Sequence, residues 1–323
     1  MIRAYGLTKR YGDKTVVDDL GFEVLPGTVT GFLGPNGAGK STTMRMLLGL
    51  DAPTRGRATI GGRAYATHPA PLHEVGALLE ARSVHPGRSA YHHLMALALT
   101  HSIPQRRVDA VLELAGIHEV ARRRVKGFSL GMGQRLGIAA ALLGDPATVI
   151  LDEPVNGLDP EGVLWIRNLL KSLAAEGRTV LVSSHLMSEM ALTAEHLIII
   201  GRGKLLADTT VERFVRESGT GSVKVVTPEA GRLTELLVGP GVGFSSDATG
   251  VLDVRGTDAE HIGRTAAAHG IPLFELTPQT ASLEQAFMDL TRDSVEYIAT
   301  PNTPATHQNH QAHQAHQSEG AAA

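Results

Sequence analysis

Val29 to Leu48 reads VTGFLGPNGAGKSTTMRMLL, and Gly34 to Ser41 within it fit the pattern G-x-x-x-x-G-K-[ST]. The pattern follows an apolar, strand-like run and precedes a helix-like run that starts at Thr42. Its glycines let successive backbone N–H groups turn toward a polyphosphate, and the following helix adds the positive end of its dipole. The stretch therefore predicts a strand, a phosphate-binding loop and a helix, in that order.

Two side chains of this loop carry specific chemistry. Lys40 would reach the β- and γ-phosphates of a nucleotide, and the Ser41 hydroxyl would ligate Mg²⁺. A glycine-rich turn that contains Gly-Lys-Ser by chance is the alternative, and the strand and helix on its flanks argue against it. The loop residues that we expect to bind the nucleotide are Gly34, Pro35, Asn36, Gly37, Ala38, Gly39, Lys40, Ser41 and Thr42.

A second motif lies far downstream, where an apolar run from Ala147 to Leu151 ends in Asp152 and Glu153. A carboxylate at the carboxyl end of a strand beside a phosphate loop can hold Mg²⁺, and Asp152 fits that role. The next residue, Glu153, is placed to polarise an attacking water. Two adjacent acids in a solvated turn are the alternative, which the buried-strand pattern before them disfavours.

Composition excludes several classes of protein. The chain has 323 residues, a net charge of −3 and no cysteine, which rules out disulfides and thiol catalysis. Hydrophobic residues make up 42% and charged residues 20%, as in ordinary globular proteins. The charges are interspersed, so we expect no nucleic-acid partner. We find no signal peptide and no apolar run of the roughly 18 to 20 residues that a spanning helix needs, so a membrane function would require another chain.

The chain divides into three regions. Residues 1–217 alternate strand-like and helix-like runs, which predicts an α/β domain with a mostly parallel sheet and a helical insertion at about 86–143. Residues 222–294 predict a small α+β domain with the order of a split βαβ sandwich, ending in a helix at Leu283–Thr291. A regulatory or dimer-supporting role and simple stabilisation both remain open for it. Residues 295–323 are rich in His, Gln and Ala, and we expect a disordered tail, with weak metal binding by its histidines as the alternative.

Specific secondary structure follows from the same patterns. Pro104 is expected at a helix start and Gly116 at a helix stop. Helices in the insertion are predicted near Ser89–His101, Gln105–Ala115 and Met132–Leu143. Buried strands of the large domain are predicted at Val29–Leu33, Thr148–Leu151, Thr179–Ser183 and His196–Ile200.

Between the two nucleotide motifs lies Phe128-Ser129-Leu130-Gly131-Met132-Gly133-Gln134-Arg135. Together with the phosphate loop it resembles the signature motif of ATP-binding-cassette (ABC) proteins, usually Leu-Ser-Gly-Gly-Gln followed by a Gln-Arg pair. Ser129 and Gly131 keep the two positions that matter most for cradling a γ-phosphate, whereas Leu130 and Met132 depart from the usual residues.

Other stretches resemble the same family in the expected order. Asn156 to Asp159 resembles its D-loop, and Ser183 to His185 resembles the loop whose histidine contacts the γ-phosphate. Tyr11 matches the aromatic residue that stacks on adenine; a structural tyrosine is the alternative. The resemblance covers residues 1 to about 217 and implies an ATPase that uses ATP and Mg²⁺, with Glu153 and His185 as catalytic residues and Asp159 near the nucleotide.

The resemblance also implies partners. ABC cassettes form a head-to-tail dimer in which each ATP lies between the phosphate loop of one copy and the signature residues of the other. This chain carries one cassette, so it would need a second copy or a paralogue.

Glu80 occupies a position where the family normally has a glutamine that contacts Mg²⁺. A carboxylate there can still bind Mg²⁺ and lie beside the phosphates. This departure, together with Ser282 to Phe287, resembles the ABC-2 export branch. That branch implies a separate integral membrane permease, a location on the cytoplasmic face of the cell membrane, and export of a drug, peptide or lipid-like compound.

Two other functions compete with export. One is an ABC ATPase that acts on ribosomes or DNA without transport. Such proteins usually carry two cassettes with a charged linker or long coiled coils, and this sequence has neither. The other is a small-molecule kinase, which the signature stretch and His185 argue against.

Overall fold

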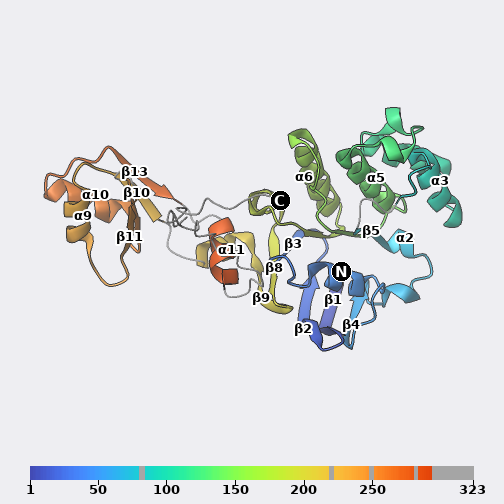
Figure 1. The fold of residues 1–323 in the computed structure, drawn as a ribbon, viewed down its shortest axis with the longest axis horizontal. Helices are drawn as coiled ribbons and strands as arrows, with labels where there is room; N and C mark the ends of the chain where they lie inside the picture. The colour runs from blue at the N-terminus through green and yellow to red at the C-terminus, as the bar shows by residue number, and fades with distance from the viewer. Residues whose placement is uncertain (80–83, 218–221, 247–250, 280–282, 293–323) are drawn as a thin grey trace, which may run out of the picture.

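The computed structural model describes residues 1–79, 84–217, 222–246, 251–279 and 283–292 (Figure 1). Glu80 and the predicted tail at 295–323 lie outside the described residues. In the described part, no helix combines the length and the apolar composition needed to cross a bilayer.

A six-stranded sheet forms the centre of the large domain. Each of the two nucleotide motifs directly follows one of its inner strands. Its strands run parallel except for β9, which pairs antiparallel with β8 at one edge. In spatial order they are β5 (Val75–Leu78), β6 (Thr148–Leu151), β7 (Thr179–Ser183), β3 (Val29–Leu33), β8 (His196–Gly201) and β9 (Lys204–Thr210).

Two hydrophobic cores cover the two faces of this sheet. Successive residues of β6 alternate between them, because side chains alternate along a strand: Val149 and Leu151 belong to one core and Ile150 to the other. Burial on both faces explains why the inner strands are continuous apolar runs. The sequence patterns at β3, β6 and β7 predicted these strands correctly.

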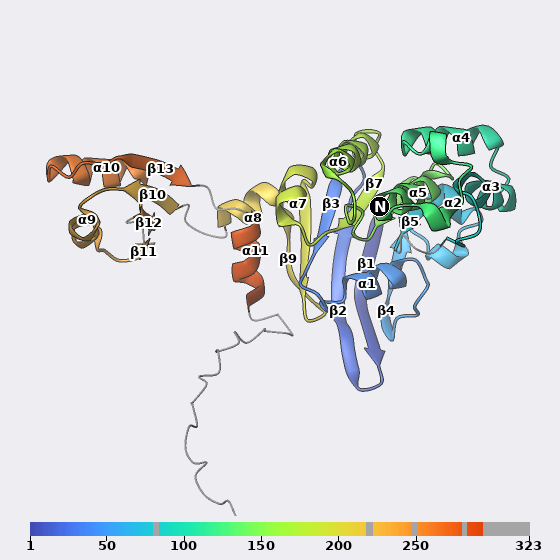
Figure 2. The same ribbon diagram turned by 45° about the horizontal axis from the view of Figure 1, so that its top comes forward.

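A three-stranded antiparallel sheet covers one face together with the helix after the phosphate loop, α1 (Lys40–Leu47). Its order is β2 (Lys14–Val24), β1 (Ile2–Tyr11) and β4 (Arg55–Ile60) (Figure 2). The tilted rings of Phe22 on β2 and Phe32 on β3 lie 5.6 Å apart between their centroids. These contacts hold β2 directly beside the strand that carries the phosphate loop.

The other face is covered by helices, including the predicted insertion. The insertion contains α3 (Ala90–Thr100), α4 (Gln105–Leu114) and α5 (Leu130–Leu142) at one end of the molecule (Figure 2). Helix α5 begins two residues earlier than predicted, because the Ser129 hydroxyl caps it by accepting a 3.2 Å hydrogen bond from the Met132 backbone N–H. Before the small domain, the large domain also contains α2 (Pro71–Glu74), α6 (Pro160–Ala175), α7 (Met187–Thr193) and α8 (Val211–Glu217), with short 3₁₀ turns at Tyr65–Thr67, His118–Val120 and Val125–Gly127.

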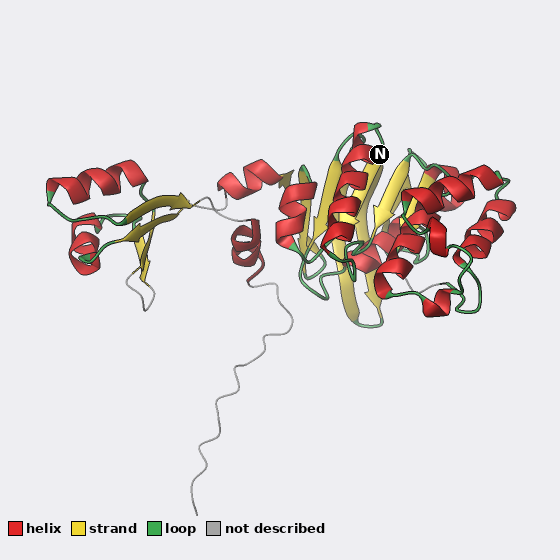
Figure 3. Cartoon of the chain, turned by 90° about the horizontal axis from the view of Figure 1, so that it is seen from above, coloured by secondary structure: helices red, strands yellow, loops and turns green. Residues whose placement is uncertain are grey.

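The small domain has the predicted order of elements. All its strand pairs are antiparallel, in the spatial order β11-β12-β10-β13, and its two helices lie on one side of the sheet (Figure 3). Val223 and Val225 face Leu233 and Ile262 in a core of their own. Its elements are β10 (Ser222–Val226), α9 (Ala230–Leu237), β11 (Gly243–Ser246), β12 (Val251–Arg255), α10 (Ala259–Ala268) and β13 (Glu275–Gln279).

The last helix, α11 (Leu283–Thr291), corrects the predicted domain division. Its bounds match the prediction, but its buried residues Leu283 and Ala286 belong to the core of the large domain, with Phe214 of α8. In Figures 1 and 2, α11 lies beside α8. The chain therefore leaves the large domain, builds the small one and returns.

Candidate nucleotide site

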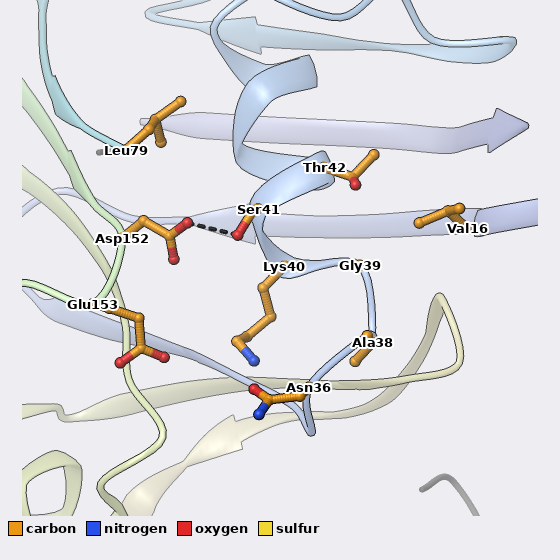
Figure 4. A pocket seen from close by; sticks show the side chains of 11 residues that line it. Val16, Asn36, Ala38, Gly39, Lys40, Ser41, Thr42, Leu79, Asp152 and Glu153 are labelled. Carbon is orange, nitrogen blue, oxygen red and sulfur yellow. Dashed lines mark hydrogen bonds between the residues drawn. The ribbon is translucent and has the colours of Figure 1, made fainter. Parts of the chain in front are cut away.

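The phosphate loop connects β3 to α1 and surrounds a cavity of about 340 Å³ (Figure 4). The cavity lies at the carboxyl ends of β3 and β6, where open α/β sheets bind ligands. Its lining consists of Val16, Asn36, Gly37, Ala38, Gly39, Lys40, Ser41, Thr42, Leu79, Asp152 and Glu153. Segments far apart in the sequence, including both predicted motifs, thus meet at one cavity.

Close backbone contacts explain two of the loop glycines. Gly39 has a left-handed φ of 100°, and a Cβ atom on it would lie 2.9 Å from the carbonyl oxygen of Val16. A Cβ on Gly34 would lie 2.5 Å from the carbonyl oxygen of Ile200. The loop is therefore held between β2 on one side and the end of β8 on the other, at a distance only glycine permits.

Lys40 begins α1 and is only 8% exposed. Its Nζ donates to the carbonyl oxygens of Gly34, at 2.6 Å, and Pro35, at 3.3 Å. Burial lowers the pKa of Lys40, and the negative charges of Glu153 and Asp152 oppose that shift without cancelling it. Its present partners are neutral carbonyls, so a phosphate oxygen would be a stronger acceptor for this ammonium.

Ser41 and Asp152 bring two hard oxygen donors together. The Ser41 hydroxyl donates to Oδ2 of Asp152 at 2.7 Å (Figure 4), and the Ser183 hydroxyl donates to Oδ1 at 2.5 Å. Serine and carboxylate oxygens suit Mg²⁺, which is usually held by one or two protein ligands plus phosphates and water. No three His, Asp or Glu side chains of the described residues cluster closely enough to hold a metal by themselves. The donor set therefore fits a metal shared with a phosphate substrate.

Glu153 is fixed on several sides. Its backbone N–H donates to the Ser183 hydroxyl at 2.9 Å, and its carbonyl accepts from Nε2 of Gln134 at 3.1 Å. Its φ of 51° is left-handed, which is uncommon for a residue other than glycine and marks stored backbone strain. Its Oε2 lies 2.7 Å from Nδ1 of His185. The two residues predicted to be catalytic are thus in direct contact.

The signature residues lie outside the lining of this cavity. Ser129 caps α5, and the carboxylate of Asp159 caps α6 by accepting from the Gly162 N–H at 3.0 Å. A Cβ on Gly131 would lie 2.8 Å from the carbonyl oxygen of Gly157, so the start of α5 packs against the loop before α6. The signature segment and the D-loop segment therefore contact each other, but neither lines the phosphate cavity of its own chain.

Tyr11 also lies outside the lining and is 49% exposed. Its hydroxyl donates to Oδ2 of Asp51 at 3.1 Å, and Nζ of Lys9 lies 4.9 Å from its ring centroid. Slight desolvation and the hydrogen bond to Asp51 raise the pKa of Tyr11. Its contact with adenine stays a prediction, as do the roles of Glu80; Leu79, the residue before Glu80, lines the cavity.

Three contributions to the site were absent from the sequence predictions. Val16 lines the cavity but has no polar side chain, so no chemical pattern marks it. Ser183 was predicted only as part of the histidine loop, yet its hydroxyl hydrogen bonds to the Asp152 carboxylate and to the Glu153 backbone N–H. Its position at the end of β7, the strand that pairs with β6, could have indicated these contacts. Gln134 had been noted only as a trailing residue of the signature, and its amide reaches the Glu153 backbone.

Comparisons with known proteins agree with this geometry. The family model described as ABC transporter matches residues 17–156, and one described as a domain of unknown function (DUF8746) matches residues 221–284. The uncharacterized ABC transporter ATP-binding protein YhcH of Bacillus subtilis is 36% identical over 298 residues, covering 90% of this chain and 96% of that protein. The bacitracin transport ATP-binding protein BcrA of Bacillus licheniformis is 43% identical over 221 residues, covering 68% and 72%.

Solved structures share the cassette fold. A structure of the ATP-binding subunit of an ABC transporter superposes with a TM-score of 0.62 and 26% identity, covering 67% of this chain and 92% of that one. The dimeric, post-hydrolysis cassette MJ0796 bound to ADP and Pi has a TM-score of 0.61 and 23% identity, covering 65% and 99%. With YhcH matched over nearly its whole length, this chain belongs to the family of ABC transporter ATP-binding proteins.

Proposed function

We propose that this chain is the subunit that hydrolyses ATP, with Mg²⁺, to drive a separate ABC-2 type membrane permease. The observation that carries the proposal is the convergence of Lys40, Ser41, Asp152 and Glu153 on one cavity at the end of the phosphate loop. ATP binding and hydrolysis are the activity of the family to which the chain belongs. We expect the exported compound to be a drug or peptide, because BcrA carries the name of a bacitracin transport protein.

The loop residues are suited to bind the triphosphate. The backbone N–H groups of the loop and the start of α1 favour the phosphate charges. Lys40 would exchange the carbonyls of Gly34 and Pro35 for β- and γ-phosphate oxygens. Ser41 and Asp152 would hold Mg²⁺, which when bound neutralises charge on the phosphates.

Glu153 is suited to orient the attacking water. Its carboxylate lines the cavity, and the hydrogen bonds of Ser183 and Gln134 to its backbone fix its position. His185, now paired with that carboxylate, would turn to the γ-phosphate when ATP occupies the site. Breaking this pair frees a lone pair of Glu153 for the water.

A second cassette would complete the site. Ser129 and Gly131 lie outside the cavity of their own chain, so they are free to cover an ATP bound to another copy or to a paralogue. We expect this dimer to sit on the cytoplasmic side of a membrane, beneath the permease. The chain itself would bind neither nucleic acid nor ribosome.

Two measurements test the proposal. Purified chain should release phosphate from ATP only when Mg²⁺ is present. Cells that co-express the chain and its permease should tolerate more of the exported compound than cells with Glu153→Gln in place of the wild-type chain. Equal tolerance would contradict the transport role, and ATP hydrolysis without a divalent cation would contradict the assigned roles of Ser41 and Asp152.

A further inference from the structure

A second cavity, of about 480 Å³, lies at the edge of the central sheet opposite the phosphate loop. It opens between the antiparallel sheet and the amino ends of β3 and β8, where β9 ends. Its lining consists of Ala4, Tyr5, Phe22, Glu23, Leu25, Thr28, Thr30, Glu195, His196, Asp208 and Thr210. It shares no lining residue with the nucleotide cavity, and the proposed ATPase function does not use it.

Three strands place a row of polar side chains in its wall. Thr30 of β3 pairs with His196 of β8, and His196 pairs with Thr210 of β9, so the three residues lie side by side across the sheet. Asp208, two residues before Thr210, lies with its Oδ1 2.6 Å from Nε2 of His196. The opposite wall is formed by Phe22 and other residues of the antiparallel sheet.

Thr30 lacks an internal partner. It is only 1% exposed and lines the cavity, yet its hydroxyl makes no hydrogen bond to any other described residue. Thr30 Oγ1 is not one of the fully enclosed polar atoms without a partner, so the hydroxyl opens into the cavity. A polar group of a ligand, or a water, in the cavity could pair with it.

The charged residues of the lining favour a cationic ligand over an anionic one. Three carboxylates, Glu23, Glu195 and Asp208, border the cavity, and no lysine or arginine does. Glu23 is paired with Arg3 at 2.9 Å and Asp208 with His196, whereas Glu195 makes no ion pair with any described residue. A phosphate or carboxylate would meet uncompensated negative charge here. An ammonium group would find a free carboxylate at the rim and a free hydroxyl in the wall.

We propose that this cavity binds a small organic cation with an apolar body, such as a primary arylalkylamine. Glu195 pairs with the ammonium group, and the Thr30 hydroxyl accepts a hydrogen bond from it. Phe22 and Leu25 pack against the apolar part, as is typical of small-molecule pockets. The site lies at the amino end of β3, the strand whose carboxyl end leads into the phosphate loop, so the two ligands occupy opposite ends of one strand.

Three matched probes test the charge preference with the full-length wild-type chain. They are 3-phenylpropylamine, 3-phenylpropanol and 3-phenylpropionate, which share the apolar body and differ in the charge of the head group. In calorimetric or NMR titrations the amine should bind saturably and most tightly, and the carboxylate should not bind. The amine should bind equally well when ATP is present, because the two cavities are separate.

Variants then locate the site. Glu195→Gln should weaken amine binding by about two- to fivefold, the range for an exposed ion pair. Thr30→Val, which keeps the shape of the side chain, should weaken it by about tenfold, as expected for a lost hydrogen bond to a charged group. The control is Glu113→Gln, an exposed acid of α4 outside the cavity, which should bind the amine like the wild-type chain.

Several results would overturn the inference. They are absence of saturable amine binding at millimolar concentration, equal affinity for all three probes, and amine binding that neither Glu195→Gln nor Thr30→Val weakens. If Thr30→Val failed to fold, Glu195→Gln alone would decide, because its side chain lies at the surface. Neither residue lines the nucleotide cavity, so a loss of ATPase activity through Lys40 or Glu153 leaves this test unaffected.

Discussion

Nδ1 of His185 lies 2.7 Å from Oε2 of Glu153, so these two side chains hold each other at the edge of the phosphate cavity. A γ-phosphate and its attacking water would have to separate them. In the proposed function the carboxylate would then gain the water as its partner, and the imidazole would gain a phosphate oxygen. This exchange would link the arrival of substrate to the positioning of both residues.

The first prediction concerns Glu153. Glu153→Gln keeps the size of the side chain but removes its basicity, so ATP turnover should fall by about a hundredfold or more. ATP affinity should remain, because Lys40 and the loop are untouched. Lys40→Ala is the contrasting variant and should weaken ATP binding itself. Phosphate release and nucleotide titrations measure both, and normal turnover in Glu153→Gln would refute the assignment.

The second prediction concerns Ser183, which positions both acids. Ser183→Ala removes the donor to Asp152 and the acceptor of the Glu153 N–H, so turnover should fall by about tenfold and its Mg²⁺ dependence should shift to higher concentration. Ser184→Ala is the matched control, because this equally buried serine only accepts from the Leu186 N–H. Both variants should lose about 1–3 kcal/mol of stability. Equal turnover in the two would show that Ser183 is merely structural.

Much of the fold was predictable because its determinants are local. The runs at Val29–Leu33, Thr148–Leu151 and Thr179–Ser183 are apolar strands bounded by polar or turn residues, and the structure confirms all three. The meeting of Lys40, Ser41, Asp152 and Glu153 at one cavity was predictable for a similar reason, since each motif follows its own strand.

Contacts between distant segments could not be read in this way. The pattern at Leu283–Thr291 indicates a helix but not which core receives its apolar face, so α11 was assigned to the wrong domain. The Tyr11 hydroxyl hydrogen bonds to Asp51, which lies forty residues away in the sequence, so no local pattern indicates the contact. Val16 and Gly203 support the phosphate loop through backbone atoms, which every residue has. Such contacts cannot be recognised in the sequence, apart from the glycine that the close approach requires.

The third prediction uses Gly203. Its N–H donates to the carbonyl of Ala38 at 3.0 Å, and its carbonyl accepts from the Asp18 N–H at 2.9 Å, which joins the β8–β9 turn to the phosphate loop and to β2. A Cβ at this position would lie 2.4 Å from the carbonyl oxygen of Val16, so Gly203→Ala must move the loop support by roughly 1 Å and lower kcat/KM for ATP by about tenfold or more.

Gly27→Ala is the control for this variant. Gly27 has a similar φ of 81°, but a Cβ there meets nothing within 4 Å. It should lose about 1 kcal/mol of stability from backbone strain and keep its kinetics. If both variants kept wild-type kcat/KM, the β8–β9 turn would not support the loop.

The fourth prediction tests where α11 belongs. Leu283 is 4% exposed in the core of the large domain, so Leu283→Ala should cost about 2–5 kcal/mol. The loss should appear in the unfolding transition that ATP stabilises, since ATP binds the same domain. Leu290→Ala on the same helix is the control: this residue is 37% exposed, and its loss should cost much less. An effect of Leu283→Ala confined to a transition that ATP does not shift would return α11 to the small domain.

The fifth prediction concerns Asp145, which connects the helical insertion to the central sheet. Its Oδ1 accepts from Arg107 of α4 at 3.0 Å and from Arg178, just before β7, at 2.9 Å. Burial raises the pKa of Asp145, but the Arg178 hydrogen bond and the charges of Arg107 and Arg178 outweigh it, and the pKa falls below its usual value. Because the folded pKa is depressed, the stabilisation is complete above the unfolded value of about 3.9 and is lost as the pH falls through the folded pKa.

Asp145→Asn removes this charge while tolerating the left-handed φ of 55°. The carboxylate is largely exposed, so the variant should lose only about 1 kcal/mol at pH 7. Urea unfolding from pH 7 down to pH 3 should show the difference from the wild-type chain shrinking as the pH falls below the unfolded value of about 3.9 toward the depressed folded pKa, because the unfolded carboxylate takes up its proton first. Asp109→Asn on the same α4 is the control at pH 7, because Asp109 makes no ion pair with any described residue and its loss should leave the stability there unchanged. A wild-type advantage that stays constant to pH 3 would mean that the two arginines stabilise Asp145 through packing rather than through its charge.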